Sequence, residues 1–506
     1  MSASQSRSGW ISLLNSSALL GMGTAMAMGI ALVLPILLFS SGIMAADDGE
    51  FEAFVEDRME QHRVAGVSIA LVEEGEPGRL FAFGVKSAES AAPVTPDSVF
   101  QVGSVSKPVA AWAVMNLVQA GVLDLDTPVD EYLTRWQLPE SEFDGTGVTL
   151  RRLLSHTAGL SLGGYPGFRL HDTLPGIEES LSGATNGSGA VYLQAEPGGG
   201  FSYSGGGYTL MQLIVEEVTG IPFSEYVSEA VLSPLGMESS SYTPDPALQS
   251  RLVEPHDFSE GVVPVYKFRA QAAASLHATA EDLGRFVAAN LKPNDVLLRE
   301  LVLLMHTPVA SARGDNIGLG FFLSAEDRVV GHSGSNTGWK AAVRFVPTAG
   351  TGIVVLTSAE SGDSLIQDTL CYWDKHYSIG ILQDRCEARR RSIESTQREM
   401  MIAAVVIASV AAGITGFFLL SLVRGRRRIQ PPSLVSWRGG SVGLFLVAAS
   451  AFLLVVYTPL GVLMAAGMSF GIATIHYLPV GSGWVAAAFT ALLLVFGSLG
   501  LLRKAT

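Results

Sequence analysis

The last acidic residue of the chain is Glu399, and the residues that follow it are apolar, polar or basic. The basic ones that follow are Arg424, Arg426, Arg427, Arg428, Arg438, Arg503 and Lys504. Before Ala46 the one charged side chain is that of Arg7. Without these eight positive charges the net charge of −14 becomes −22 on residues 47–399. The chain is therefore expected to hold an acidic soluble domain between two apolar, basic ends.

The C-terminal end contains apolar runs that are long enough to span a bilayer. Met400–Val423 has 24 residues without a charge, which is roughly 36 Å of helix against a hydrocarbon core of about 30 Å. Further runs cover about 442–464 and 484–502. The basic residues at 424–428 and 503–504 mark the cytoplasmic ends of the first and third runs. The sequence therefore predicts a three-helix transmembrane region with everything before Met400 outside the cytoplasmic membrane.

The N-terminal end predicts the same orientation. An apolar stretch from Ala18 to Phe39 follows Arg7 and is longer than the 7–15 or so residues of a secretory signal core. An uncleaved anchor is favoured, and cleavage near Ala45 or Ala46 stays open. The expected domains are a signal anchor or signal peptide at 1–46, a soluble domain at 47–395 and the transmembrane region at 396–506. The chain is thus expected to be a multi-pass membrane protein whose soluble domain is periplasmic or extracellular.

The charge of the soluble domain limits its partners. Nucleic acid is excluded, because phosphate binding needs a positive surface. The bilayer is the expected lipid partner of the apolar runs alone, and the sequence names no protein partner. Cys371 and Cys386 lie in the exported part, where a disulfide is permitted and would add about 3 kcal/mol. A pair of unbridged thiols is the equal alternative, because the sequence does not give their Cα separation.

The apolar patterns of the soluble domain predict strands at both ends and helices between them. Val67–Val72 and Leu80–Val85 predict a hairpin, and Ala341–Val346 with Ile353–Thr357 predicts a second strand pair. Helices are expected at 105–120 and 208–219, each ended by a glycine. The predicted fold class is α/β, of the α+β kind, with one antiparallel sheet and a helical subdomain.

Three short motifs carry candidate chemistry. Ser104 and Lys107 stand three residues apart at a predicted helix start, so they share a helix face near the positive end of the dipole. Tyr203 lies in a glycine-rich turn before the second helix, where it could equally cap a backbone group. His332, Ser333, Gly334 and Ser335 precede a strand and could equally form a polar turn. Each motif alone is weak, since Ser-x-x-Lys recurs by chance.

Together, in this order, the motifs resemble those of the serine β-lactamase and penicillin-binding-protein superfamily, in its class C β-lactamase, DD-peptidase and esterase branch. Ser104–Lys107 matches the family's Ser-x-x-Lys, Tyr203 its Tyr-x-Asn, and His332–Gly334 its Lys-Thr-Gly or His-x-Gly triplet. The stretch 153–160 is also similar to this branch, in which Ser155 and His156 are structural. The resemblance covers about residues 54–361.

The resemblance implies a β-lactamase-like fold and a serine hydrolase that forms an acyl-enzyme without metal or cofactor. Ser104 would be the nucleophile, with Lys107 and Tyr203 as its activating pair. A tyrosine acts as a base when ionised, and an ammonium about 4 Å away favours that state by roughly 4 kcal/mol. His332, Ser333, Gly334 and Ser335 would bind the substrate, with the N–H groups of Ser104 and Ser335 forming the oxyanion hole.

Two positions depart from the family pattern. Gly205 stands where the family often has asparagine, and His332 where β-lactamases usually have lysine. A neutral imidazole binds a carboxylate less strongly than an ammonium does. An ester or a peptide acyl substrate is therefore expected before a β-lactam, as in an esterase, a D-aminopeptidase or a DD-peptidase-like enzyme.

Two other classes compete with a hydrolase. A penicillin-binding or peptidoglycan-sensing protein would be acylated at Ser104 with little turnover, but residues 424–440 are a short cytoplasmic segment for signalling. A transporter is disfavoured because the apolar runs contain no acidic residue.

Overall fold

The computed structural model describes residues 48–425, apart from 88, 184–187, 313, 325, 327 and 378–379, and also residues 427–429 and 502–504. The chain divides into two compact units, Met1–Asp48 and Gly49–Thr506. The N-terminal segment 1–46 and the apolar runs at 442–464 and 484–501 lie outside the described residues. The boundary expected at 395 falls within one continuous helix, α13 (Gln383–Val423).

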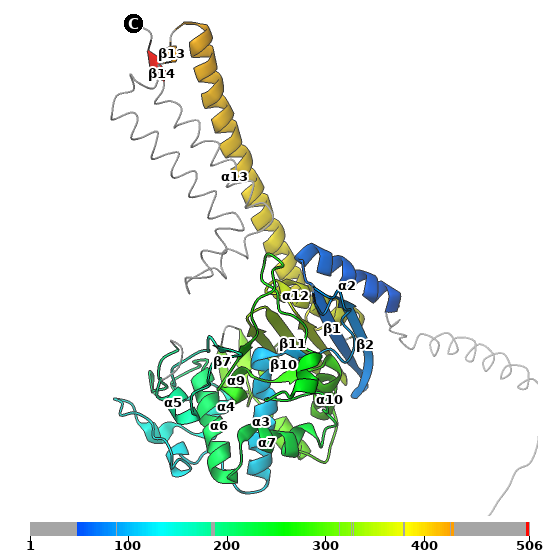
Figure 1. Ribbon diagram of the computed structural model, residues 1–506, viewed down its shortest axis with the longest axis vertical. Helices are drawn as coiled ribbons and strands as arrows, with labels where there is room; N and C mark the ends of the chain where they lie inside the picture. Colours follow the sequence, from blue (N-terminus) through cyan, green and yellow to red (C-terminus); the bar gives the residue numbers. More distant parts are fainter. Residues whose placement is uncertain are drawn as a thin grey trace, which may run out of the picture. The chain divides into compact units, whose positions relative to one another are not determined.

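An eight-stranded antiparallel sheet forms the centre of the larger unit (Figure 1). Its order is β2-β1-β12-β11-β10-β9-β8-β7, so strands from the two ends of the soluble domain are neighbours. The strands are β1 (Gly66–Glu73), β2 (Glu76–Gly84), β7 (Ala310–Ala312), β8 (Asp315–Ile317), β9 (Phe322–Ser324), β10 (Val329–Asn336), β11 (Trp339–Val346) and β12 (Thr351–Thr357). The predicted antiparallel sheet is confirmed.

Among the described residues, three small strand pairs lie outside this sheet. They join β3 (Phe100–Gln101) to β6 (His277–Ala278), β4 (Phe168–Arg169) to β5 (Tyr266–Lys267), and β13 (Arg427–Ile429) to β14 (Leu502–Lys504).

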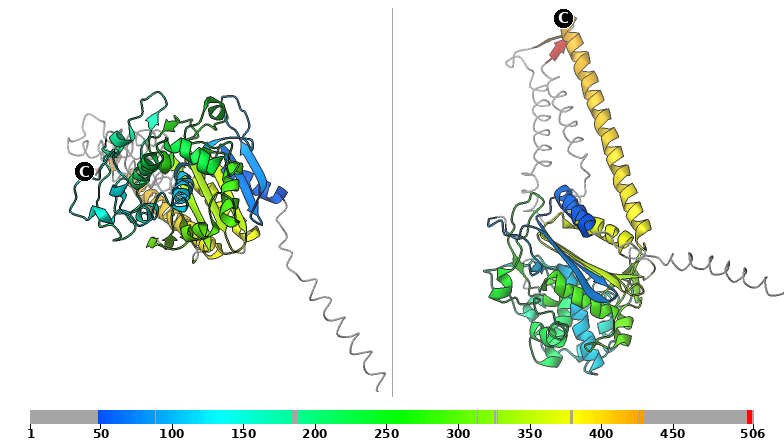
Figure 2. Two further views of the ribbon diagram at one scale, coloured as in Figure 1. Left: turned by 90° about the horizontal axis from the view of Figure 1, so that it is seen from below. Right: turned by 90° about the vertical axis from the view of Figure 1, so that its right-hand side faces the viewer.

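Helices cover both faces of the sheet (Figures 1 and 2). One face carries α2 (Asp48–His62) and α12 (Gly362–His376), and the other carries the helical subdomain. Its helices are α3 (Ser106–Gln119), α4 (Leu150–Leu154), α5 (Ile177–Leu181), α6 (Gly205–Thr219), α7 (Phe223–Val227), α8 (Pro246–Ser250), α9 (Gln271–Ala274), α10 (Ala280–Leu291) and α11 (Arg299–Met305), with short turns η1 (Gly103–Val105), η2 (Val129–Glu131), η3 (Gly145–Gly147) and η4 (Ser228–Leu232).

The middle of β12, residues 353–356, is a continuous apolar run because both faces of the sheet are buried there. In β12, Val354 and Leu356 belong to the core under the helical subdomain, whereas Ile353 and Val355 belong to the core under α2 and α12. Successive side chains of a strand point to opposite faces, so a strand covered on both sides reads as a continuous apolar run.

The predicted elements are present with shifted ends. The second strand of the first hairpin begins at Glu76 rather than at residue 80, because Glu74 and Gly75 form a two-residue turn with φ of 52° and 74°. Helix α6 begins three residues earlier than expected, since the Ser204 hydroxyl caps it by accepting the Gly207 N–H. Gly220, with φ of 74°, ends α6 as predicted.

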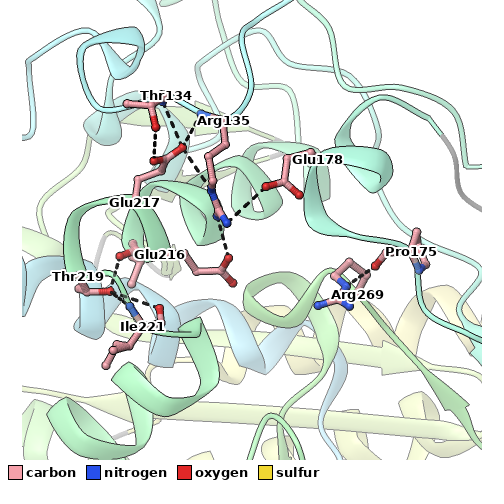
Figure 3. A network of polar contacts seen from close by, with 10 residues as sticks. Thr134, Arg135, Pro175, Glu178, Glu216, Glu217, Thr219, Ile221 and Arg269 are labelled. Atoms are coloured by element: carbon pink, nitrogen blue, oxygen red, sulfur yellow. Dashed lines mark hydrogen bonds and ion pairs between the residues drawn. The ribbon is translucent and has the colours of Figure 1, made fainter.

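An ion-pair cluster around Arg135 holds the outer part of the helical subdomain (Figure 3). The guanidinium lies 3.1 Å from Glu216, 3.5 Å from Glu217 and 3.4 Å from Glu178. Glu217 also accepts the backbone N–H of Arg135 at 2.8 Å. The cluster therefore ties the loop after η2 to the C-terminal end of α6 and to α5.

The C-terminal part of the soluble domain is cross-linked. A disulfide joins Cys371 of α12 to Cys386 of α13 across a Cα separation of 5.8 Å. Arg389 of α13 also pairs with Asp368 of α12 at 2.7 Å. The bridge that the sequence left open is thus formed. Within the part of the chain that the structure describes, no helix has both the length and the apolar character needed to cross a membrane.

Candidate active site

Ser104 and Lys107 meet at the start of α3. Ser104 lies in η1, and Lys107 is in the first turn of α3 with only 2% of its surface exposed. The Lys107 ammonium donates to Ser104 Oγ at 3.0 Å and to the carbonyl oxygen of Ala273 at 2.7 Å. The carbonyl comes from α9, so this short helix orients the lysine toward the serine. Among the described residues Lys107 has no carboxylate partner in an ion pair.

Ser106, the neighbouring serine, has a structural role. Its hydroxyl donates to the Gly103 carbonyl at 2.6 Å and accepts the Leu276 N–H at 2.9 Å. It is fully buried, whereas Ser104 is partly exposed. Of the two serines, Ser104 is the one that a substrate can reach.

Tyr203 lies on the turn before α6, above the lysine. The Lys107 ammonium is 4.9 Å from the centre of the Tyr203 ring. The Tyr203 hydroxyl makes no hydrogen bond to another described residue. Contacts of this kind are often long before substrate binds. Tyr208 is also near Lys107, but it is buried and its hydroxyl donates to the Leu154 carbonyl at 3.1 Å.

His156 sets the conformation of the Tyr203 turn. Its Nδ1 accepts the backbone N–H of Ser204 at 3.1 Å, and its ring lies 4.2 Å from that of Tyr203. Burial, with the nearby Lys107 charge, holds the pKa of His156 well below its usual range. His156 is thus a neutral acceptor in the described site, which agrees with the structural role expected for it.

Two glycines bring the end of β10 against η1. A Cβ on Gly334 would lie 1.9 Å from the Val102 carbonyl oxygen and 3.1 Å from the Ser104 nitrogen. A Cβ on Gly103 would lie 2.6 Å from the Ser335 nitrogen. The absence of both side chains therefore allows the backbone nitrogens of Ser104 and Ser335 to approach the same small region. Two N–H groups so placed are the arrangement that stabilises an oxyanion.

The four residues predicted to bind substrate divide between the two faces of β10. His332 is buried on the face of the helical subdomain, where its ring lies 5.1 Å from Phe322 and 6.4 Å from Tyr203. Its Nδ1–H donates to the Ser333 carbonyl at 2.6 Å. Burial and the Lys107 charge lower the pKa of His332 to about 3. His332 is therefore neutral at pH 7.

Ser333 and Ser335 point to the opposite face and are exposed. The Ser333 hydroxyl accepts from Arg344 Nη2 at 2.7 Å, and the Ser335 hydroxyl accepts from Lys340 Nζ at 2.7 Å. The structure thus brings Ser104, Lys107, Tyr203 and His332 together, and separates from them the hydroxyls of Ser333 and Ser335. Ser335 reaches the site through its backbone.

Several contributors were missed by sequence reasoning. The Ala273 carbonyl is a backbone group, for which no side-chain signal exists. Phe322 stacks beside Tyr203 with ring centres 6.5 Å apart, and Phe201 lies 6.2 Å from Phe322. Isolated phenylalanines are not distinctive in a sequence. Lys340 could have been noticed as a lysine within an apolar strand. No group of His, Cys, Asp and Glu side chains in the described ranges is arranged to hold a metal ion.

Comparisons with known proteins agree with this geometry. The family model described as Beta-lactamase matches residues 51–370. Penicillin-binding protein 4 of Amycolatopsis lactamdurans is 31% identical over 329 residues, which cover 61% of this chain and 84% of that protein. Protein flp of Staphylococcus aureus is 23% identical over 325 residues, covering 62% of this chain and 63% of its own length.

A solved structure is similar as well. The octameric penicillin-binding protein homologue from Pyrococcus abyssi has a TM-score of 0.55 and 26% identity, over 62% of this chain and 74% of that one. The region matched by the family model, residues 51–370, contains the sheet, the helical subdomain and every residue of the site described above. The chain is a serine hydrolase and belongs to the beta-lactamase family, with penicillin-binding proteins among its relatives.

Proposed function

We propose that the chain hydrolyses an ester or amide bond of a small or peptide-like substrate through an acyl-enzyme on Ser104. The observation that carries the proposal is the Lys107 ammonium, which lies 3.0 Å from Ser104 Oγ and 4.9 Å from the Tyr203 ring. A serine hydroxyl needs a base to attack an acyl carbon, and Lys107 and Tyr203 are the side chains proposed to supply it.

The reaction would run in two steps. Ser104 Oγ attacks the acyl carbon and gives its proton to the Lys107–Tyr203 pair, while the negative charge on the carbonyl oxygen is held by the N–H groups of Ser104 and Ser335. The pair then returns the proton to the leaving group as its bond to the acyl carbon breaks. Water then attacks the acyl carbon and gives a proton to the same pair. The bond from the acyl carbon to Ser104 Oγ breaks, the pair returns the proton to that oxygen, and the acid leaves. An oxyanion donor of this kind contributes about 3–4 kcal/mol to the stability of the transition state.

The environment of His332 favours a substrate that has no carboxylate at the point where it faces this imidazole. The imidazole is buried, has a pKa of about 3 and lies beside the rings of Phe322 and Tyr203. A neutral ring in an aromatic setting attracts an anion weakly. We expect short activated esters to be hydrolysed faster than nitrocefin. Gly205→Asn together with His332→Lys should raise hydrolysis of nitrocefin relative to that of esters, because a Cβ on Gly205 meets no atom closer than 3.4 Å. Rapid nitrocefin hydrolysis by the wild type would show that neither departure limits the enzyme.

A peptidoglycan-like peptide is the natural substrate class that we propose. The similarity to penicillin-binding protein 4 of Amycolatopsis lactamdurans supports this substrate class. Retention of the acyl group on Ser104 for hours would instead favour the sensing role over the hydrolase.

Anchoring in the cytoplasmic membrane, with the hydrolase outside, completes the proposal. Large apolar side chains of α13 are exposed, among them Met401, Phe417 and Val423. Arg427 and Arg428 of β13 pair with Lys504 and Arg503 of β14, which supports both basic clusters being on one side. The Cys371–Cys386 disulfide supports an oxidising compartment. Phosphatase fusions after Glu399 should be active and fusions after Ile429 silent, and the reverse pattern would place the hydrolase in the cytoplasm.

The catalytic part is tested by intact-protein mass spectrometry after exposure to a fluorophosphonate, a penicillin and a D-alanyl ester. We expect one covalent adduct, which Ser104→Ala removes and Ser106→Ala leaves in place. Ser106 is the matched control, because it is two residues away and its hydroxyl is fully engaged. An adduct that persists in Ser104→Ala would show that the nucleophile is another residue.

A further inference from the structure

Lys340 and Glu360 form an ion pair behind the end of β10. The Lys340 Nζ and Glu360 Oε2 atoms are 2.6 Å apart, and their side chains are 9% and 19% exposed. The same ammonium donates to the Ser335 hydroxyl at 2.7 Å. The second carboxylate oxygen of Glu360 accepts the Gly338 N–H at 2.8 Å. One ion pair thus holds both sides of the β10–β11 turn to the segment that follows β12.

Besides this ion pair, Asn336 supports the end of β10, because its Nδ2 donates to Gln101 Oε1 at 2.9 Å and to the Ala274 carbonyl at 3.1 Å. The pairing of β10 with β9 ends at Gly331, and from there to Asn336 the strand is paired with β11 alone. Gly334 lacks a side chain that could anchor the strand, and the η1 segment facing it contains Gly103. The position of the Ser335 nitrogen therefore depends on the β10–β11 hairpin and on what fixes the hairpin tip.

We propose that Lys340 and Glu360 are positioning residues, which hold the Ser335 N–H where it stabilises the oxyanion formed at Ser104. Lys340 acts through the Ser335 hydroxyl, and Glu360 acts through Lys340 and the Gly338 N–H. The inference rests on the proposed acyl transfer, in which Ser335 acts through its backbone. A donor must lie within a few tenths of an ångström of its place to be fully effective, so loosening the hairpin lowers the rate of acylation.

The alternative role for these atoms is a second serine nucleophile. Lys340 contacts an exposed serine at a distance shorter than that between Lys107 and Ser104. However, a general base needs a free lone pair, and Lys340 lies against a carboxylate to which it donates. Lys107 also donates, but its ammonium lies 4.9 Å from the ring of Tyr203, with which it forms the proposed base. The contacts therefore make Lys340 a hydrogen-bond donor and leave Ser335 unactivated.

The test compares an oxygen ester with its thionoester, because a C=S group gains little from an oxyanion hole. Lys340→Met should lower kcat for the ester by about 10–100-fold, a fraction of the loss of a whole donor, with KM little changed. The ratio of ester to thionoester kcat/KM should fall about 10-fold. Glu360→Gln should act in the same direction, and Lys340→Arg should restore most of the ratio. A role confined to stability would leave that ratio unchanged.

The matched control is the ion pair of Lys292 with Glu76. It joins the same residue types at 2.7 Å, but the side chains are 45% and 69% exposed. Lys292→Met should leave both the ratio and the rate unchanged. Should Lys340→Met fail to fold, Ser335→Ala removes only the accepting hydroxyl and should lower the ratio by a similar factor.

Two outcomes would overturn the inference while leaving the proposed function in place. One is an unchanged ratio in folded Lys340→Met, or in Ser335→Ala when that variant replaces it. The other is a fluorophosphonate adduct mapped to Ser335. Failure of the proposed function looks different, since the wild type would then form no adduct at Ser104 and hydrolyse neither substrate.

Discussion

Replacing Gly334 by alanine tests whether the close approach of β10 and η1 builds the oxyanion site. The added Cβ would lie 1.9 Å from the Val102 carbonyl oxygen, and a Cβ is essentially never found closer than 3.0 Å to such an atom. The two segments must therefore separate by about 1.1 Å, the difference between these distances. A displacement of about 1 Å can cost roughly 100-fold in rate, and overpacking costs about 1–3 kcal/mol of stability.

The rate of fluorophosphonate labelling and the thermal unfolding midpoint measure these two effects. We expect labelling of Gly334→Ala to slow by about 100-fold while the protein remains folded. Gly145→Ala is the control, since a Cβ there meets nothing within 4 Å and its φ is not in the left-handed region. A folded Gly334→Ala variant that is labelled within about threefold of the wild-type rate would refute the reasoning, because the site would then tolerate the displacement.

Three further outcomes are expected. Tyr203→Phe should slow acylation by about two to four orders of magnitude, and Lys107→Ala should slow it by a similar factor. The double variant should be little slower, because the effects of residues that act as a unit are not additive. Additive losses in single-turnover kinetics would contradict this prediction. Folding lowers the pKa of His332 from 6.5 to about 3. Between these pH values the unfolded chain therefore binds more protons at His332 than the folded chain does. The free energy of unfolding should fall as the pH drops through that window, by up to about 1.4 kcal/mol per pH unit. Urea unfolding at pH 7 and pH 4.5 should show a smaller loss in His332→Gln than in the wild type, and equal losses would assign the pH dependence to other groups. Cys371→Ser removes the disulfide to Cys386, which lies 15 residues further along the chain. Denaturant titration should show a loss of about 3 kcal/mol of stability, and the labelling assay should show an unchanged rate of acylation. A labelling rate that falls together with the stability would show that the disulfide supports the site.

The sequence by itself determined the local parts of the site. The spacing of Ser104 and Lys107 places them on one helix face whatever the rest of the fold does, because three residues are close to one helical turn. The same holds for the hairpins, whose apolar runs and glycine-containing turns are local properties. The end of α6 at Gly220 also follows from one residue's freedom at positive φ.

Only the tertiary structure decided which distant groups meet at Ser104. The Ala273 carbonyl orients Lys107 across 166 positions of the chain, and a backbone acceptor leaves no mark in the sequence. The pairing of Cys371 with Cys386 depended on a Cα separation that follows from how α12 and α13 pack. The pleat of β10 divided His332 from Ser333 and Ser335, and the register with β11 then brought Lys340 to the Ser335 hydroxyl. Contacts of this kind arise from sheet register and burial, which depend on the whole chain at once rather than on neighbours along it.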